Sequence, residues 1–124
     1  MEFLKLTVAG KLEHIEADFP EYEEGLGNEF NEFVHEQINC EMYELAYTPS
    51  LWNGACMLVD ESGKLTGKKV NIVAWWIANR LNPLDPIVGD VLFCGTHRVG
   101  ELQELDFCGL NAEQIKYITR VVEG

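Results

Sequence analysis

Basic residues are scarce in this chain, and none occurs between Lys11 and Lys64. Nine Lys and Arg stand against 21 Asp and Glu, which gives a formal net charge of −12. The stretch between those two lysines carries thirteen carboxylates: Glu13, Glu16, Asp18, Glu21, Glu23, Glu24, Glu29, Glu32, Glu36, Glu41, Glu44, Asp60 and Glu61. A field of this sign repels nucleic acid and anionic membranes and attracts cations or basic proteins. The composition therefore predicts a basic protein as partner, with no direct nucleic-acid or membrane binding.

Long apolar runs are also missing. The longest, residues 72–78, is far shorter than the roughly 20 residues of a membrane-spanning helix. The first ten residues are acidic and alternate in polarity, unlike the basic start and apolar block of a secretory signal. We therefore expect a soluble protein in the cytoplasm of a bacterial host cell.

Motifs for phosphate binding and nucleophilic catalysis are absent. Residues 63–67 lack the spacing of a Walker loop, and no G-x-S-x-G elbow occurs. A small hydrolase would have to use Asp90, Cys94 and His97, which lie near one another in sequence. Catalytic triads rarely come from neighbouring residues, so we predict no catalytic residue and no enzyme activity.

The four cysteines are widely spaced and include no C-x-x-C pair: they are Cys40, Cys56, Cys94 and Cys108. This pattern favours reduced, mostly buried thiols in a cytosolic protein. The alternative is a zinc site based on Cys94 and His97 and completed by Cys108, Cys56 or His35. Zinc modules usually have two paired ligands at each end, so no metal and no other cofactor is predicted.

The chain does contain enough apolar material for one folded domain. Hydrophobic residues make up 47% of its 124 residues, so the high net charge does not indicate disorder. Residues 4–8 and 12–15 alternate in polarity around a glycine turn and predict a β-hairpin. Residues 19–27 read as a polar connector. Further strands are expected at residues 42–47, 55–59, 87–93 and 102–107, with Gly95 marking the end of the third.

Three helices are expected from their capping residues. Asn28 is the predicted N-cap of the first, Asn71 caps residues 72–81, and Asn111 begins a near capping box with Gln114. The resulting order, ββαββαββα, predicts a single α+β domain over residues 1–124, with about three helices packed on a mainly antiparallel sheet.

The first of these helices has an acidic outer side. Its apolar residues share one side of a helical wheel, while Glu29, Glu32 and Glu36 lie within about 60° of one another on the far side. Their axial spacing of about 4.5 and 6 Å resembles the charge spacing of a nucleic-acid duplex. Exposed helix faces are also Glu-rich for solubility alone. We predict a partner-binding surface that includes Glu21, Glu23, Glu24, Glu29, Glu32 and Glu36.

Tryptophans form a second group of candidates. Trp75 and Trp76 project about 100° apart, so they cannot both point to one seam. One interpretation places one of them in the core and the other at a partner interface; the favoured alternative is that all three tryptophans pack inside the protein. Trp75 is our candidate anchor, and Trp52, at a predicted turn, is another. The helix around them is apolar on nearly all sides, which is typical of a helix that is buried or forms a partner interface. An interface between copies of this chain, a homo-oligomer, is therefore a further interpretation.

Short motifs follow one another from Val59 onward: Val59 to Leu65, then Gly67, Asn71 and Ala74, then Ile87 to Gly95, and finally Leu110, Gln114 and Ile115. With these motifs the C-terminal half resembles a numbered family of domains of unknown function, found in small proteins of phages, conjugative elements and gut bacteria. The family brings no established activity or catalytic residue. The resemblance implies an accessory product of a mobile element, and such small acidic products often inhibit host defence proteins.

We therefore predict a non-enzymatic interaction protein. Its expected role is stoichiometric inhibition of a host nucleic-acid-binding or defence protein, of the anti-CRISPR or anti-restriction type, through an acidic surface. The alternative is a protein that sequesters a small molecule or signalling nucleotide through Arg80 or Arg98. A small hydrolase is the less favoured alternative.

Overall fold

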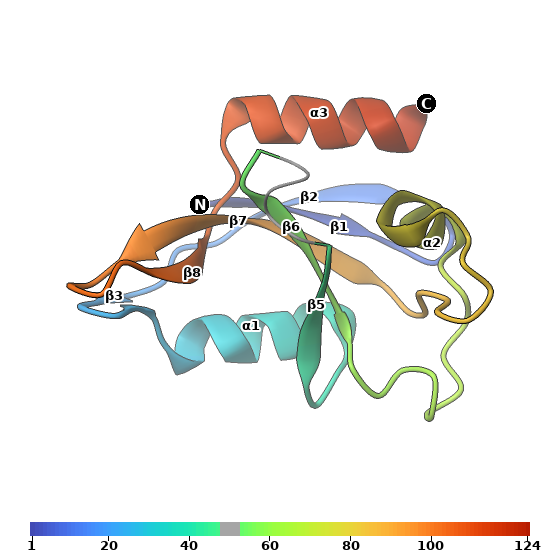
Figure 1. The fold of residues 1–124 in the computed structure, drawn as a ribbon, viewed down its shortest axis with the longest axis horizontal. Helices are drawn as coiled ribbons and strands as arrows, with labels where there is room; N and C mark the ends of the chain where they lie inside the picture. Colours follow the sequence, from blue (N-terminus) through green and yellow to red (C-terminus); the bar gives the residue numbers. More distant parts are fainter. Residues whose placement is uncertain (48–52) are drawn as a thin grey trace.

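The computed structural model, which describes residues 1–47 and 53–124, shows a mainly antiparallel sheet with helices on both faces (Figure 1). The elements follow in the order β1 (Glu2–Leu6), β2 (Leu12–Glu16), β3 (Glu21–Tyr22), β4 (Gly25–Leu26), α1 (Asn28–Ile38), β5 (Tyr43–Tyr47), β6 (Ala55–Asp60), α2 (Ile72–Asn79), β7 (Val91–Val99), β8 (Glu104–Cys108) and α3 (Ala112–Glu123). The main sheet has the order β2-β1-β7-β6-β5, and β8 also pairs with β7. The predicted α+β class and its three helices are confirmed.

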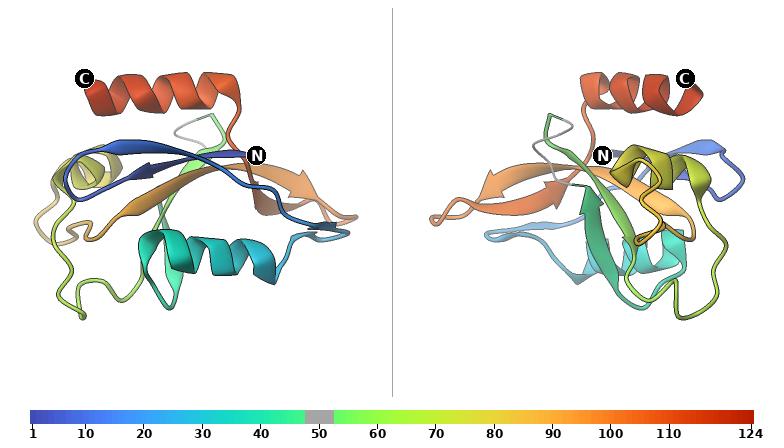
Figure 2. Two further views of the ribbon diagram at one scale, coloured as in Figure 1. Left: turned by 180° about the vertical axis from the view of Figure 1, so that it is seen from behind. Right: turned by 45° about the vertical axis from the view of Figure 1, so that its right-hand side comes forward.

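Alternating side chains divide the core into two layers. On β6, Ala55, Met57 and Val59 pack with residues of α2 and α3. Cys56 and Leu58 of the same strand pack with residues of α1 on the other face. Figures 1 and 2 show this arrangement, with α1 on one side of the sheet and both α2 and α3 on the other. Successive side chains of a strand point to opposite faces, so both faces of the central strands are covered.

Strand β7 differs from its predicted form. It begins at Val91 and runs through Gly95 to Val99, so the expectation that Gly95 ends the strand is wrong. Gly95 pairs with Ala55 on one side and Cys108 on the other. A Cβ atom there would lie 2.6 Å from the carbonyl oxygen of Gly109. The glycine is thus required by a close backbone approach inside the sheet, which is a second common reason for glycine in a strand.

The helix caps are partly as predicted. Asn71 accepts a hydrogen bond from the amide of Ala74, and Asn111 and Gln114 form a complete capping box. The N-cap of α1, however, is Gly27 rather than Asn28, because the Gly27 carbonyl accepts the first hydrogen bonds of the helix. Helix α2 ends at Asn79, two residues early, since Arg80 has the left-handed φ of 54°.

Two further sequence expectations concern loops. The predicted polar connector at residues 19–27 contains a small hairpin, β3–β4, which forms its own two-stranded sheet. The predicted turn residue Trp52 lies outside the described residues.

Among the helices that the structure describes, none combines the length and apolar character needed to cross a membrane.

Several residues of the C-terminal motifs, together with Lys68, form a polar node near the N-terminal end of α2, which we define as Asp60, Lys68, Asn71 and Asp90. The Lys68 ammonium lies 2.7 Å from Asp60 and also donates to the Ile38 carbonyl at the end of α1. The Asn71 amide donates to the carbonyls of Leu6 and Gly89, and Asp90 accepts from the amide of Val8. These contacts join β1, α1, β6 and α2, which supports structural roles for the motif residues.

Candidate functional site

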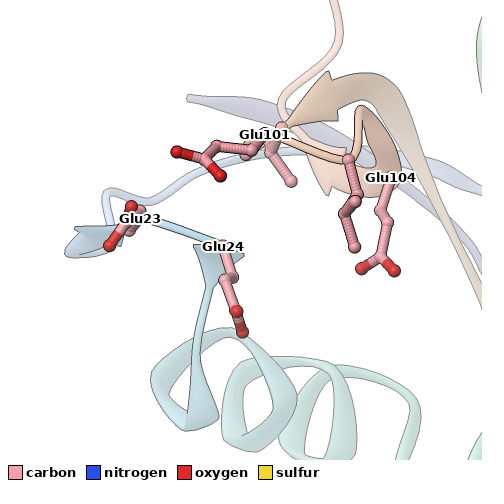
Figure 3. A pocket seen from close by; sticks show the side chains of 7 residues that line it. Glu23, Glu24, Glu101 and Glu104 are labelled. Atoms are coloured by element: carbon pink, nitrogen blue, oxygen red, sulfur yellow. The ribbon is translucent and has the colours of Figure 1, made fainter.

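The two hairpins at the other end of the sheet enclose an acidic cleft. It lies between the β3–β4 turn and the β7–β8 turn, has a volume of about 290 Å³, and is lined by Glu23, Glu24, Val99, Gly100, Glu101, Leu102 and Glu104. Figure 3 shows Glu101 extending from the β7–β8 turn toward Glu23 on the other hairpin. We call this feature the acidic cleft and refer to Glu23, Glu24, Glu101 and Glu104 as the cleft glutamates.

Asp106 on β8 fixes the position of the β3–β4 hairpin. Its Oδ2 accepts a hydrogen bond from the backbone amide of Leu26 at 2.7 Å. A Cβ atom on Gly25 would lie 1.8 Å from the same oxygen, and Gly25 also has a φ of +112°. Glycine is therefore required for this approach, because another residue would collide with Asp106 and would adopt a strained backbone conformation. The β3–β4 hairpin, which forms one wall of the cleft, is thus attached to the main sheet.

Tyr22 and Glu29 join the same hairpin to the start of α1. The Tyr22 hydroxyl donates to Glu29 Oε1 at 2.6 Å. This hydrogen bond raises the pKa of Tyr22 and lowers the pKa of Glu29. A Cβ atom on Gly27 would lie 2.8 Å from the Tyr22 ring, so glycine is also needed at this junction. Glu29 consequently positions the hairpin in addition to contributing charge.

The outer side of α1 continues the acidic surface. Glu29, Glu32 and Glu36 are exposed, as predicted, while Phe30, Val34 and Ile38 are buried on the inner side. We call the three glutamates the glutamate ridge, and we call the ridge and the cleft together the acidic surface. The first turn of α1 follows directly after the β3–β4 hairpin, so the ridge begins beside the cleft (Figure 1).

Basic side chains are placed away from this surface or are already paired. Lys64 pairs with Asp85, and Lys68 with Asp60. Arg98, in the β7–β8 hairpin, donates to the carbonyl of Gln103 and is not among the residues that line the cleft. Lys116 and Arg120 are exposed on α3, across the sheet from α1. Within the described residues, no Lys or Arg pairs with the four cleft glutamates.

Part of the predicted partner-binding set comes together here. Glu23 and Glu24 line the cleft, whereas Glu21 lies in a smaller hollow of about 50 Å³ beside His97 and Cys108. Glu101 and Glu104 were not predicted, because nothing local indicates which hairpin turn will meet another. The sequence signal for them is weak: the two glutamates lie three residues apart and flank the apolar Leu102. In the structure this leucine is 83% exposed.

Trp75 lies far from this group, on α2 across the sheet. Its indole Nε1 donates to the carbonyl of Asn82 at 2.9 Å, and its ring packs against the core. The exposed tryptophan of this helix is instead Trp76, which has a fractional exposure of 54%. Internal packing is therefore wrong for Trp76, and the tryptophan that packs against the core is Trp75, the candidate anchor.

The residues of the rival chemistries are not brought together. Cys94 is fully buried under α1, and His97 is exposed. Asp90 lies seven residues before His97 along an extended strand, which at 3.3 Å per residue places it about 23 Å away. Burial and the neighbouring Cys56 raise the pKa of Cys94 well above its usual value, which disfavours a nucleophilic thiolate. Over residues 1–47 and 53–124, no group of three or more His, Cys, Asp or Glu side chains could hold a metal ion.

Comparison with known proteins identifies the family alone. A family model described as a domain of unknown function, DUF3846, matches residues 12–123, so the chain belongs to this family. No curated protein matches, and no solved structure matches. The match begins at residue 12 and so extends well beyond the C-terminal half that carries the short motifs.

Proposed function

We propose that this protein is a non-enzymatic binding protein whose acidic surface occupies a basic groove of a host nucleic-acid-binding or defence protein. The observation that carries the proposal is the acidic cleft: four glutamates from two separate hairpins line one space, and no basic residue is among its lining residues. The hydrogen bond to Asp106 holds the two hairpins together despite this shared charge, and the Tyr22–Glu29 hydrogen bond holds the β3–β4 hairpin to α1.

The energetics support a role in binding. Like charges in water repel each other, and the repulsion increases as they approach. Four glutamates along one cleft therefore contribute nothing favourable to folding, whereas they favour the approach of a cationic partner. An acidic surface that is already ordered also loses little conformational entropy on binding.

The shape of the acidic surface suits a groove that normally receives a nucleic acid. The glutamate ridge repeats negative charge along about 10 Å of helix, and the cleft adds four carboxylates at its end. Proteins that bind duplexes neutralise phosphates with Lys and Arg, and such a groove would attract this ridge by the same electrostatics. The family resemblance to accessory proteins of phages and mobile elements leads us to include anti-CRISPR and anti-restriction activity in the proposal.

Affinity capture with matched variants tests this function. The cleft variant Glu101→Gln/Glu104→Gln and the control variant Glu113→Gln/Glu123→Gln on α3 remove the same number of charges. We expect wild type and control to capture a nucleic-acid-binding protein from host lysate, and we expect the cleft variant to capture at least tenfold less. Capture should also fall steeply between about 0.05 and 0.5 M salt.

A competition assay identifies what the partner's groove normally holds. Added nucleic acid should release this protein from its captured partner, because both occupy the same basic groove. Equal capture by the cleft and control variants would refute the proposed surface. A partner that binds nucleic acid and this protein simultaneously would refute occlusion of the groove, and a sequestering role for small anions would then be examined at Arg80 and Arg98.

A further inference from the structure

Two cysteines face each other in the middle of the sheet. Cys56 on β6 and Cys94 on β7 are direct partners in the antiparallel ladder, and their Sγ atoms lie 3.3 Å apart. Both side chains are fully buried, in the layer that also contains Phe30, Val34 and Ile38 of α1. Neither thiol has a role in the acidic surface.

The backbone geometry at this pair is compatible with a disulfide. Directly opposed residues of antiparallel strands have Cα atoms about 4.5 or 5.5 Å apart. Disulfides bridge Cα separations of about 4.4 to 6.8 Å, with an S–S bond of about 2.05 Å. The two sulfur atoms therefore need to approach by only about 1 Å, which rotation of the side chains can supply without separating β6 from β7.

We propose that Cys56 and Cys94 form an oxidisable dithiol that hydrogen peroxide converts into a disulfide between β6 and β7. In the first step one thiol loses its proton, and its thiolate sulfur attacks a peroxide oxygen and breaks the O–O bond; the sulfur becomes a sulfenic acid, and the departing hydroxide takes up the released proton to give one water. In the second step the other thiol attacks the sulfenic sulfur, forms the S–S bond and releases the second water. Two thiols are oxidised, one peroxide is reduced, and two waters leave.

Burial determines the oxidant and the rate. Hydrogen peroxide is small and uncharged, so it can enter through brief local openings that exclude larger disulfides such as oxidised glutathione. Burial raises the pKa of the Cys94 thiol, and the thiolate is the reactive form. The reaction is therefore slow and responds to sustained oxidation. Once formed, the bond closes a long loop that includes all of α2, and it should raise the melting temperature by about 10 °C.

The partly exposed Cys40 and Cys108 provide the control. The variant Cys40→Ala/Cys108→Ala keeps the buried pair and changes only partly buried side chains at the margin of the core. After exposure to hydrogen peroxide, denaturation and alkylation, we expect this variant to have no free thiol, a mass lower by two hydrogen atoms, and one peptide link between residues 56 and 94. Reduction by dithiothreitol should reverse all three changes.

Two results would overturn the proposal. One is a buried pair that stays reduced in the double variant while the wild type loses thiols, which would assign the oxidation to Cys40 or Cys108. The other is separate oxidation of Cys56 and Cys94 to sulfinic acids without a crosslink. Cys56→Ser tests the same point independently: it should stop crosslinking, and a crosslink of Cys94 to Cys108 in that variant would reveal a different resolving thiol.

Discussion

At the α2 end of the sheet, Asp60, Lys68, Asn71 and Asp90 all have protein partners, whereas at the hairpin end four glutamates share one cleft without any basic partner among the described residues. Both groups are polar, and both join segments that are distant in sequence. The polar node satisfies backbone and charged groups that the fold has buried. The acidic cleft instead exposes like charges, which stabilise nothing within the chain. The comparison separates polar residues that maintain the fold from those available to a partner.

The largest expected effect comes from removing the centre of the polar node. Asn71→Ala would remove a side-chain donor from the buried carbonyls of Leu6 and Gly89 and would remove the cap of α2. We expect a loss of about 3–5 kcal/mol in the free energy of unfolding, measured by urea denaturation. Asn111→Ala, at the exposed cap of α3, is the control and should cost only about 1 kcal/mol. Equal losses in the two variants would contradict the structural role given to Asn71.

A somewhat smaller effect is expected at the ion pair. Lys68→Met would leave the buried carboxylate of Asp60 without its cation, at a cost of about 3 kcal/mol. Adding Asp60→Asn to that variant should recover part of the loss, because no uncompensated charge then remains. Urea denaturation of the wild type, both single variants and the double variant gives the coupling energy. A coupling energy near zero would show that the pair does not act as a unit.

Neutralising the acidic cleft should have almost no cost in stability. Glu101→Gln/Glu104→Gln relieves repulsion, so we expect the free energy of unfolding to rise by about 0.5 kcal/mol at low salt and to change less at high salt. The control Glu113→Gln/Glu123→Gln changes one charge at each end of α3, where the effects on the helix dipole offset each other. A clear destabilisation of the cleft variant would assign these glutamates to the fold rather than to binding.

The smallest effect is local and depends on pH. The raised pKa of Tyr22 means that its hydrogen bond contributes below the ordinary tyrosine pKa and is lost as pH rises through the folded value. The lowered pKa of Glu29 means that the same bond is lost as pH falls through the folded value of that carboxyl. NMR titration of ring-labelled tyrosine should show Tyr22 shifting toward its ordinary pKa in Glu29→Gln. Tyr43, whose pKa burial raises to about 12, should not shift.

Much of the fold follows from local patterns in the sequence. The hairpin of β1 and β2, the cap at Asn71 and the capping box at Asn111 depend on residues within a few positions of one another, and all three were predicted. The exposed ridge on α1 follows from helical periodicity for the same reason. The errors occur where a residue has two common uses: Gly95 fits a strand end or a close backbone contact, and only its neighbours across the sheet distinguish them.

The sequence by itself determined the α+β class, the acidic character and the helix on which the ridge lies, because composition and periodicity are properties of the chain alone. The tertiary structure decided that Glu101 and Glu104 meet Glu23 and Glu24, that Cys56 faces Cys94, and that Trp76 is exposed instead of Trp75. Each of these depends on strand register or on packing between segments that are distant in sequence. Such contacts are selected by the energy of the whole fold, which no short stretch of sequence contains.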